Sequence, residues 1–224
     1  NQRVAEKNDI SNFIRALITD HQGNIYFSAE GSGIAVLDSS GKFKKMLLKE
    51  NGASFEVAYR DRSGRIWLGG LGLYVYDPGE KRFVQSNTIR CLLGSRISSI
   101  LQLQDGNMLV GTYTHLFRAD PGSFTAQEVQ GIQDLHQIFS FLYELPGNEL
   151  LVGLRDRGLK RYRSAGKGYT LLKNIHSSLF VKSALRVSSD ELWLATTEGM
   201  YSYRVSNGLL QPLAEVNQKL PNQY

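Results

Sequence analysis

The chain has 224 residues, of which 42% are hydrophobic and 21% charged, an ordinary balance that excludes disorder over the whole length. It holds 22 glycines but only 5 prolines, which favours many tight turns between extended segments and excludes collagen-like and proline-rich structures. The 26 Lys and Arg exceed the 21 Asp and Glu, and the net charge of +5 favours anionic partners without identifying one.

Several classes of protein are excluded before any motif is considered. Cys91 is the single cysteine, so no internal disulfide can form, and we expect a packed thiol. No apolar run approaches the ~20 residues that cross a bilayer, so we expect no membrane contact from this segment. The basic residues are scattered and no helix-turn-helix, zinc-finger or RNP pattern presents them, so we expect no nucleic-acid binding. Because the chain opens on Asn1 without a leader, we expect a processed or excised piece.

One unit recurs five times along the chain. It begins with a turn that carries Gly or Asp, followed by an apolar strand that ends in a small residue. The aliphatic residue after the turn recurs at steps of 41, 42, 42 and 42 residues, a register that chance does not maintain. The five copies are Gly23–Ser28, Gly64–Gly69, Gly106–Gly111, Asn148–Gly153 and Asp190–Ala195.

Each copy is flanked by further extended segments. An extended run precedes the turn at Phe13–Thr19, Glu56–Arg60, Ile97–Leu103, Ile138–Glu144 and Val181–Val187. A third run follows at Gly33–Asp38, Gly72–Asp77, His115–Asp120, Gly158–Arg163 and Gly199–Arg204. A shorter fourth run follows, as at Phe43–Leu48 and Phe83–Gln85. Each unit therefore predicts four strands.

Four strands in about 42 residues is the length of one propeller blade, and the short turns exclude the helices of ankyrin, TPR or HEAT repeats. We predict an all-β fold, a β-propeller with about five blades of four antiparallel strands, in a single domain over residues 1–224. The repeats run approximately over 13–54, 55–96, 97–137, 138–180 and 181–220. The next aliphatic residue would fall beyond Tyr224, which favours an arc of a larger propeller over five closed blades, although both stay open.

The first two units resemble a known family. The run Asp20–Tyr26 and the run Asp61–Gly69, the latter followed by Gly72–Asp77, are similar to the two-component regulator propeller repeat. The resemblance covers about residues 10 to 210 and weakens later, where Leu103 and Leu145 replace the aspartate and Asp190 replaces the turn glycine.

The resemblance implies a fragment of a periplasmic sensor domain, often seven-bladed, in a hybrid two-component system. It implies recognition of an oligosaccharide, neutral or anionic, released from a complex glycan, and signalling to a histidine kinase outside this chain. The partners implied are the remainder of the same sensor protein and a second copy in a homodimer. No cofactor and no catalysis are expected, although an enzyme would draw on Glu30 and Glu198. The alternative hypothesis is a protein-interaction scaffold.

Candidate ligand residues follow from the loops of a blade. The connection between strands two and three shares a face of the propeller with the connection from one blade to the next, and propeller ligands usually lie on that face. Arginine forks and Tyr rings there suit carboxylates, sulfates and sugar rings. The ligand-binding candidates are Tyr113, His115, Arg155, Arg157, Arg96, His176, Glu30 and Glu198. The competing interpretation is that these residues are solvated loop tips.

Three further patterns have plain structural interpretations. No ligand-spacing motif supports a metal site at His115, His136 and His176, so we expect no metal. Trp67 and Trp193 occupy one repeat position, which predicts packing between blades. The basic run Arg155–Lys167, with only Asp156 to oppose it, predicts a solvated outer strand or, second, an anionic ligand or subunit surface.

Overall fold

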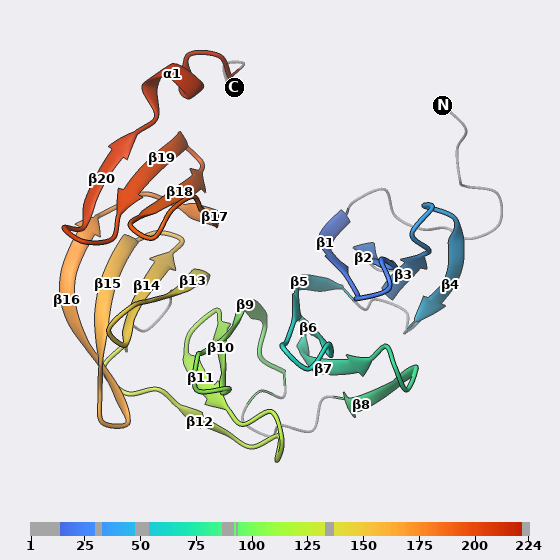
Figure 1. Cartoon of the computed structure of the whole chain (residues 1–224). Helices are drawn as coiled ribbons and strands as arrows, with labels where there is room; N and C mark the ends of the chain where they lie inside the picture. The colour runs from blue at the N-terminus through green and yellow to red at the C-terminus, as the bar shows by residue number, and fades with distance from the viewer. Residues whose placement is uncertain are drawn as a thin grey trace. The chain divides into compact units, whose positions relative to one another are not determined.

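The structure, a computed structural model, describes residues 14–29, 33–47, 54–86, 92, 94–132 and 137–220. Within them the chain forms five four-stranded antiparallel sheets, each built from four consecutive strands (Figure 1). The predicted all-β propeller blades are therefore confirmed. Cys91, Glu30, Arg90 and His136 lie outside the described residues.

The first two sheets follow the first two repeats. Each pairs its strands in chain order, β1-β2-β3-β4 and β5-β6-β7-β8. Their strands are β1 (Ile14–Thr19), β2 (Ile25–Ala29), β3 (Gly33–Leu37), β4 (Phe43–Leu47), β5 (Phe55–Arg60), β6 (Ile66–Gly70), β7 (Gly72–Asp77) and β8 (Arg82–Ser86).

The remaining sheets have the same order, and a short helix follows the last of them. Their elements are β9 (Ile97–Gln102), β10 (Met108–Thr112), β11 (Leu116–Ala119), β12 (Ala126–Glu128), β13 (Phe139–Leu145), β14 (Glu149–Leu154), β15 (Gly158–Ala165), β16 (Gly168–His176), β17 (Val181–Arg186), β18 (Glu191–Thr196), β19 (Gly199–Arg204), β20 (Leu209–Pro212) and α1 (Ala214–Asn217).

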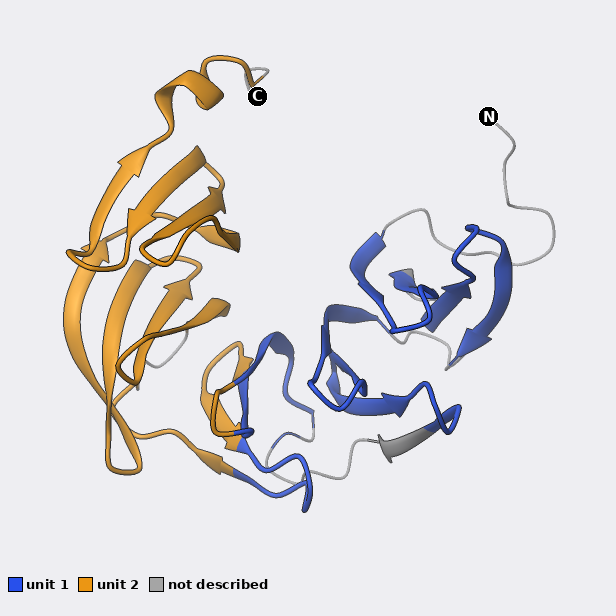
Figure 2. Cartoon of the chain, in the orientation of Figure 1, with its two compact units in different colours: residues 1–102, 106–110, 119–126 blue, residues 103–105, 111–118, 127–224 orange. Residues whose placement is uncertain are grey.

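The chain divides into two compact units, coloured in Figure 2. Unit 1 comprises Asn1–Gln102, Gly106–Val110 and Ala119–Ala126, and unit 2 comprises Leu103–Asp105, Gly111–Arg118 and Gln127–Tyr224. The boundary passes through the third sheet, so each unit is described by itself.

Unit 1 buries the facing surfaces of its first two sheets. Tyr26 of β2 and Tyr76 of β7 lie with ring centroids 5.9 Å apart, and Phe55, Ile66 and Leu68 complete this core. The backbone N–H of Phe55 also donates to Ser28 Oγ at 3.2 Å. Burial of these apolar side chains provides the main driving force for packing one sheet on the next.

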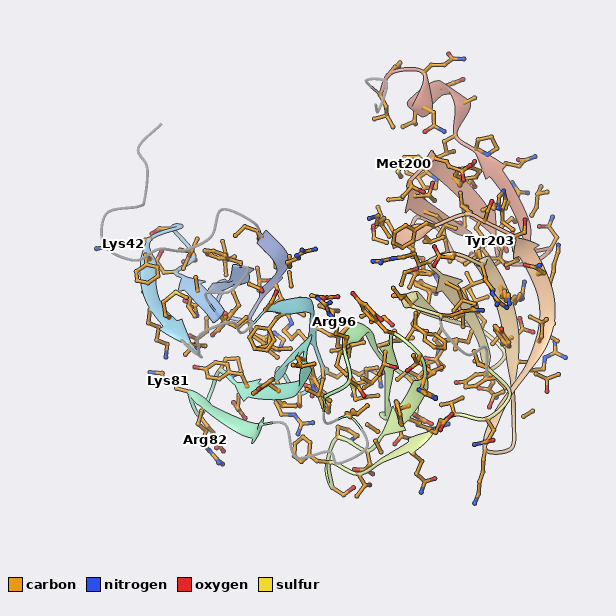
Figure 3. The ribbon with its side chains drawn as sticks, turned by 180° about the vertical axis from the view of Figure 1, so that it is seen from behind. Lys42, Lys81, Arg82, Arg96, Met200 and Tyr203 are labelled. Atoms are coloured by element: carbon orange, nitrogen blue, oxygen red, sulfur yellow. The ribbon has the colours of Figure 1, made fainter. Side chains whose placement is uncertain are left out.

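Unit 2 buries an equivalent core between its last two complete sheets. Leu151 of β14 packs with Leu192, Leu194 and Tyr203 of the next sheet. Tyr203, labelled in Figure 3, is fully buried. The predicted packing role of the repeat tryptophan position is confirmed for Trp67, which is 0% exposed, whereas Trp193 on the last sheet is half-buried.

Small residues stand near the end of the second strand because little space is left there for a side chain. A Cβ on Gly69 would lie 2.5 Å from Ile97 Cγ2 of the next sheet and 2.7 Å from Val57 Cγ1 of its own sheet. A Cβ on Gly153 would lie 2.9 Å from Cβ of Phe141, its pairing partner on β13. These distances are too short for real carbon contacts. The fifth repeat carries Ala195 at this position, and Ala195 is half-buried.

A β-bulge marks the first strand of four sheets. The register shifts between the first and third residues of β1, β5, β13 and β17. The residue inside the shift is Arg15, Glu56, Ser140 or Lys182. A bulge turns its extra residue away from the ladder and is common next to binding sites.

Asp61 organises the turn between β5 and β6 of unit 1. Its carboxylate accepts from the backbone N–H groups of Ser63 and Arg65, from the Arg65 side chain at 2.9 Å and from Trp67 Nε1 at 2.8 Å. Burial acts to raise the pKa of Asp61, but hydrogen bonds from Ser63 and Trp67 and the charge of Arg65 outweigh it and leave the pKa lowered. Gly64 has φ +90°, which a side chain would strain.

In unit 2, Glu149 of β14 is the carboxylate that holds two arginine side chains. It accepts from Arg161 Nε and from Arg163 Nη2, the latter at 2.7 Å. Arg161 Nη1 then donates to Tyr203 Oη at 3.1 Å and to the Val205 carbonyl at 2.8 Å in the next sheet. The expectation that only Asp156 opposes the basic run was wrong, because the pairing of β14 with β15 places Glu149 opposite Arg163.

Candidate functional site

Arg155 lies close to two aromatic rings in unit 2. It lies in the turn after β14, where its backbone N–H donates to the Ile138 carbonyl at 3.0 Å. Its guanidinium carbon lies 6.0 Å from the ring centroid of Tyr113, in the turn after β10. It lies 5.5 Å from the ring centroid of Phe180, immediately before β17. Both contacts are within the range of cation–π attraction.

Lys182 extends this arrangement. Its Nζ lies 4.4 Å from the Phe180 ring centroid, and it is the bulge residue of β17. Tyr113, Arg155, Phe180 and Lys182 thus form a series of alternating rings and cations over three successive repeats, which we call the cation–aromatic row. The sequence prediction that Tyr113 and Arg155 lie together agrees with this geometry.

The row is accessible and carries uncompensated positive charge. Arg155 and Lys182 are exposed, whereas Tyr113 and Phe180 are half-buried. Within the described part of the chain, no carboxylate forms an ion pair with Arg155 or Lys182, and the Arg155 side chain donates no hydrogen bond. The guanidinium is therefore positioned by its ring contacts while its N–H donors stay available.

Arg96 does not join the row. It belongs to unit 1, where its Nη2 lies 2.7 Å from Glu56 Oε1 and its backbone bridges to Leu71 (Arg96 is labelled in Figure 3). The ion pair places an opposite charge directly against the guanidinium. A structural role at the start of β9 therefore accounts for Arg96.

The two described histidine candidates support turns. His115 Nδ1 lies 2.7 Å from Thr114 Oγ1, and the His115 ring lies beside Phe117. His176 Nδ1 accepts from the backbone N–H groups of Ser178 and Leu179 at 3.3 and 3.1 Å. His115 is nevertheless close to the row in sequence, two residues from Tyr113, whereas His176 serves as a cap at the end of β16.

The remaining candidates lie on turns or outside the described residues. Arg157 is exposed in the same turn as Arg155. Glu198, in the β18–β19 turn, is exposed and hydrogen-bonds Tyr201. Glu30 is not described, so the proposed pairing of Glu30 with Glu198 has no geometry to support it.

Phe180 and Lys182 were missed from the sequence. Phe180 lies in the connection from the fourth to the fifth repeat, which the loop argument had placed on the ligand face, so its position could have identified it. Lys182 is the second residue of β17, at the bulge position that recurs at Arg15, Glu56 and Ser140. Its spacing of two residues from Phe180 is the signal in the sequence that could have linked the two side chains.

Neither a metal-binding cluster nor a membrane-spanning helix is found in the described ranges. No group of three His, Cys, Asp or Glu side chains there is arranged to hold a metal ion. No helix there is long and apolar enough to span a membrane.

Comparison with known proteins relates the fold to solved propellers. No family model matches the chain, and no curated protein matches it. It is similar to the extracellular domain of a protein described as the hybrid two component system BT4673 from B. thetaiotaomicron, with 20% identity, a TM-score of 0.73, and coverage of 94% of this chain and 28% of that chain. The extracellular domain of BT3049 from the same organism has 14% identity, a TM-score of 0.64, and coverage of 90% of this chain and 30% of that chain.

A different class of propeller is equally similar in fold. Virginiamycin B lyase from Staphylococcus aureus, solved with quinupristin, has 13% identity, a TM-score of 0.72, and coverage of 98% of this chain and 73% of that chain. The chain spans less than a third of the length of the BT4673 and BT3049 domains. The similarity establishes the propeller fold, which hosts both sensors and enzymes, so function has to be argued from the site.

Proposed function

We propose that this chain is a non-catalytic, extracytoplasmic sensor segment of a hybrid two-component system, and that it binds an oligosaccharide on the loop surface of unit 2. The observation that carries the proposal is Arg155, whose guanidinium lies close to the rings of Tyr113 and Phe180 with its N–H donors available. A surface cation that served only solubility would need no aromatic rings beside it.

The row offers the two kinds of contact that sugars use. Half-buried rings present apolar faces on which the C–H face of a sugar packs, and the guanidinium offers several donors to sugar oxygens. We include Arg157, in the turn of Arg155, His115, two residues from Tyr113, and Glu198, on a turn of unit 2, in the candidate surface. The four residues of the row include no carboxylate and no imidazole, so the row lacks an acid–base pair for catalysis.

The repeat resemblance favours the sensor interpretation over an enzyme. The first two repeats of this chain resemble the two-component regulator propeller repeat, and the BT4673 and BT3049 domains, which share the fold, are extracellular domains of hybrid two-component systems. By that resemblance the location is the periplasm, and the signal passes to a histidine kinase outside this chain. The partners are the remainder of the sensor protein and a second copy.

A protein-interaction scaffold is the second candidate. It is favoured by exposed apolar side chains on the first strand of the fifth sheet, where Leu185 is 65% and Val187 47% exposed. Such side chains suit a protein surface better than a sugar.

The test is a thermal-shift screen of the whole chain against neutral and acidic oligosaccharides. A ligand that binds only the native state raises the melting temperature with the logarithm of its concentration over Kd. We expect one class of oligosaccharide to give a saturable shift that Arg155→Gln reduces. No shift with any saccharide would reject the sensor proposal and favour the scaffold, and release of shortened products would favour an enzyme.

A further inference from the structure

We infer that the cation–aromatic row is an acid subsite that recognises the carboxylate of a uronic-acid residue in the bound oligosaccharide. This inference rests on the proposed function and adds the class of sugar. Four observations carry it: the charge of the row, the N–H groups of the exposed Arg155, the second cation at Lys182, and the different side chains at the same register positions of the second sheet.

The positive charge of the row favours an anionic ligand. Arg155 and Lys182 both contact the Phe180 ring, so their cationic centres lie within about 10 Å, comparable with the screening length at physiological salt. Two like charges at this separation repel each other, and no carboxylate of the described residues neutralises either one. A bound anion between them relieves that repulsion and gains attraction from both.

The chemistry of Arg155 favours a carboxylate. Its side chain is exposed, and its guanidinium carbon lies 5.5 Å from the Phe180 ring centroid and 6.0 Å from that of Tyr113. The planar guanidinium presents its N–H groups as a fork that matches two carboxylate oxygens.

Lys182 brings a second cation to the same ring. It follows Phe180 by two residues, a spacing that places both side chains on one face of an extended backbone. Its ammonium nitrogen lies 4.4 Å from the Phe180 ring centroid. Phe180 thus has the cations of both Arg155 and Lys182 around it.

The second sheet of unit 1 carries different side chains at the register positions of the row. It has Leu71 at the position of Arg155, and Glu56, which pairs with Arg96, at the position of Lys182. The same backbone positions therefore carry an apolar side chain and a neutralised ion pair in that sheet. The combination of Arg155 with Lys182 is thus a property of the side chains in unit 2 and not a requirement of the repeat.

The test is isothermal titration of the whole chain with trigalacturonate and with a glucuronate trisaccharide. Their methyl esters, which keep the shape and remove the charge, are the matched ligand controls. We expect at least one acid to bind and its ester to bind about ten-fold more weakly or worse. We also expect the affinity for the acid to fall as salt is raised.

Variants distinguish bidentate recognition by the Arg155 guanidinium from general electrostatic attraction. Arg155→Gln and Arg155→Lys should each raise Kd by about ten-fold, because neither offers the bidentate fork. Phe180→Leu and Lys182→Gln should raise it by about three- to five-fold. Lys167→Gln removes an equally exposed charge from the β15–β16 turn and should change Kd less than two-fold by the same reasoning. Circular dichroism checks that each variant is folded.

The outcomes distinguish the two proposals. Binding of neutral trisaccharides with no preference for acids overturns the acid subsite and leaves the sensor function standing. Equal binding of acid and ester, or tight binding only to a sulfated disaccharide without a uronate, also overturns it. Acid binding that Arg155→Lys and Phe180→Leu leave unchanged places the site elsewhere. No saccharide binding at all rejects both proposals.

Discussion

The second sheet in unit 1 and the fourth sheet in unit 2 stabilise the same part of the repeat with different side chains. In the second sheet Asp61 and Trp67 form a hydrogen bond within one turn and strand. In the fourth sheet leucine replaces both, and Glu149 takes the register position of Arg65. The negative charge has thus moved four residues along the chain.

The move changes how the carboxylate is connected. Asp61 closes its own turn by accepting from two backbone N–H groups, and it also accepts from Trp67 and Arg65. Arg65 in turn donates to the Pro121 carbonyl at 3.0 Å, in the turn after β11 of the third sheet.

Glu149 holds Arg161, which in turn donates to Tyr203 of the next sheet and to the Val205 carbonyl just after it. Both carboxylates therefore hold an arginine that reaches the following repeat, and Asp61 in addition closes its own turn.

The largest effect is expected from Glu149→Gln. Loss of this carboxylate leaves Arg161, whose side chain is 17% exposed, without its counter-charge, and such losses cost about 3 kcal/mol. Urea denaturation followed by circular dichroism measures the change. Glu128→Gln on the exposed β12 is the matched control and should leave the midpoint unchanged. An equal midpoint for both variants would contradict the joining role of Glu149.

Asp61→Ala should rank second. The fully buried Trp67 loses the acceptor of its indole N–H and two turn N–H groups lose theirs, at a cost of about 2 kcal/mol. The denaturation midpoint and the tryptophan emission should both change. Asp38→Ala is the control, because Asp38 makes the same turn bonds to Ser40 and Lys42 but is only half-buried, whereas Asp61 is buried. It should have the smaller effect, and the reverse order would refute the role of Trp67.

Tyr203→Phe should have a smaller effect, about 1 kcal/mol. It removes one hydroxyl that accepts from Arg161, while the Val205 carbonyl still accepts from the same nitrogen. Tyr201→Phe, which loses a bond to the exposed Glu198, should be nearly neutral. A double-mutant cycle of Tyr203→Phe with Glu149→Gln should show coupling, since Arg161 links both residues. Strict additivity would show that Arg161 does not link them.

The smallest effect is expected in the pH dependence of the stability difference between the native chain and Glu149→Gln. Burial acts to raise the pKa of Glu149, but Arg163 and Arg161 outweigh it and hold the pKa below its ordinary 4.5. The unfolded chain therefore takes up the proton first as pH falls, so this contribution to stability is present above 4.5 and lost as pH falls through the folded pKa. The difference in melting temperature between the native chain and Glu149→Gln should be constant near neutrality and shrink in acid. A constant difference down to acid unfolding would contradict the lowered pKa.

The sequence predicted the fold well because the repeat is an apolar pattern with fixed steps. Core positions such as Ile66, Leu150 and Leu192 need only be apolar and in register, and that is readable from one chain. The polar contacts were harder to predict, because Glu149 meets Arg163 through strand pairing and Arg161 meets Tyr203 across two sheets. The candidate site was half predicted: Tyr113 and Arg155 follow from loop position, whereas Lys182 is linked to the site only by its spacing of two residues from Phe180, which was itself missed.

The two tryptophans give the molecule a built-in pair of optical reporters. Trp67 is shielded from solvent in unit 1 and donates to Asp61, whereas Trp193 is half-buried in unit 2 and donates to Glu191 at 3.1 Å. An aqueous quencher such as iodide should reach Trp193 and spare Trp67. Emission of the quenchable and shielded fractions during unfolding would therefore follow each unit separately, with no label attached.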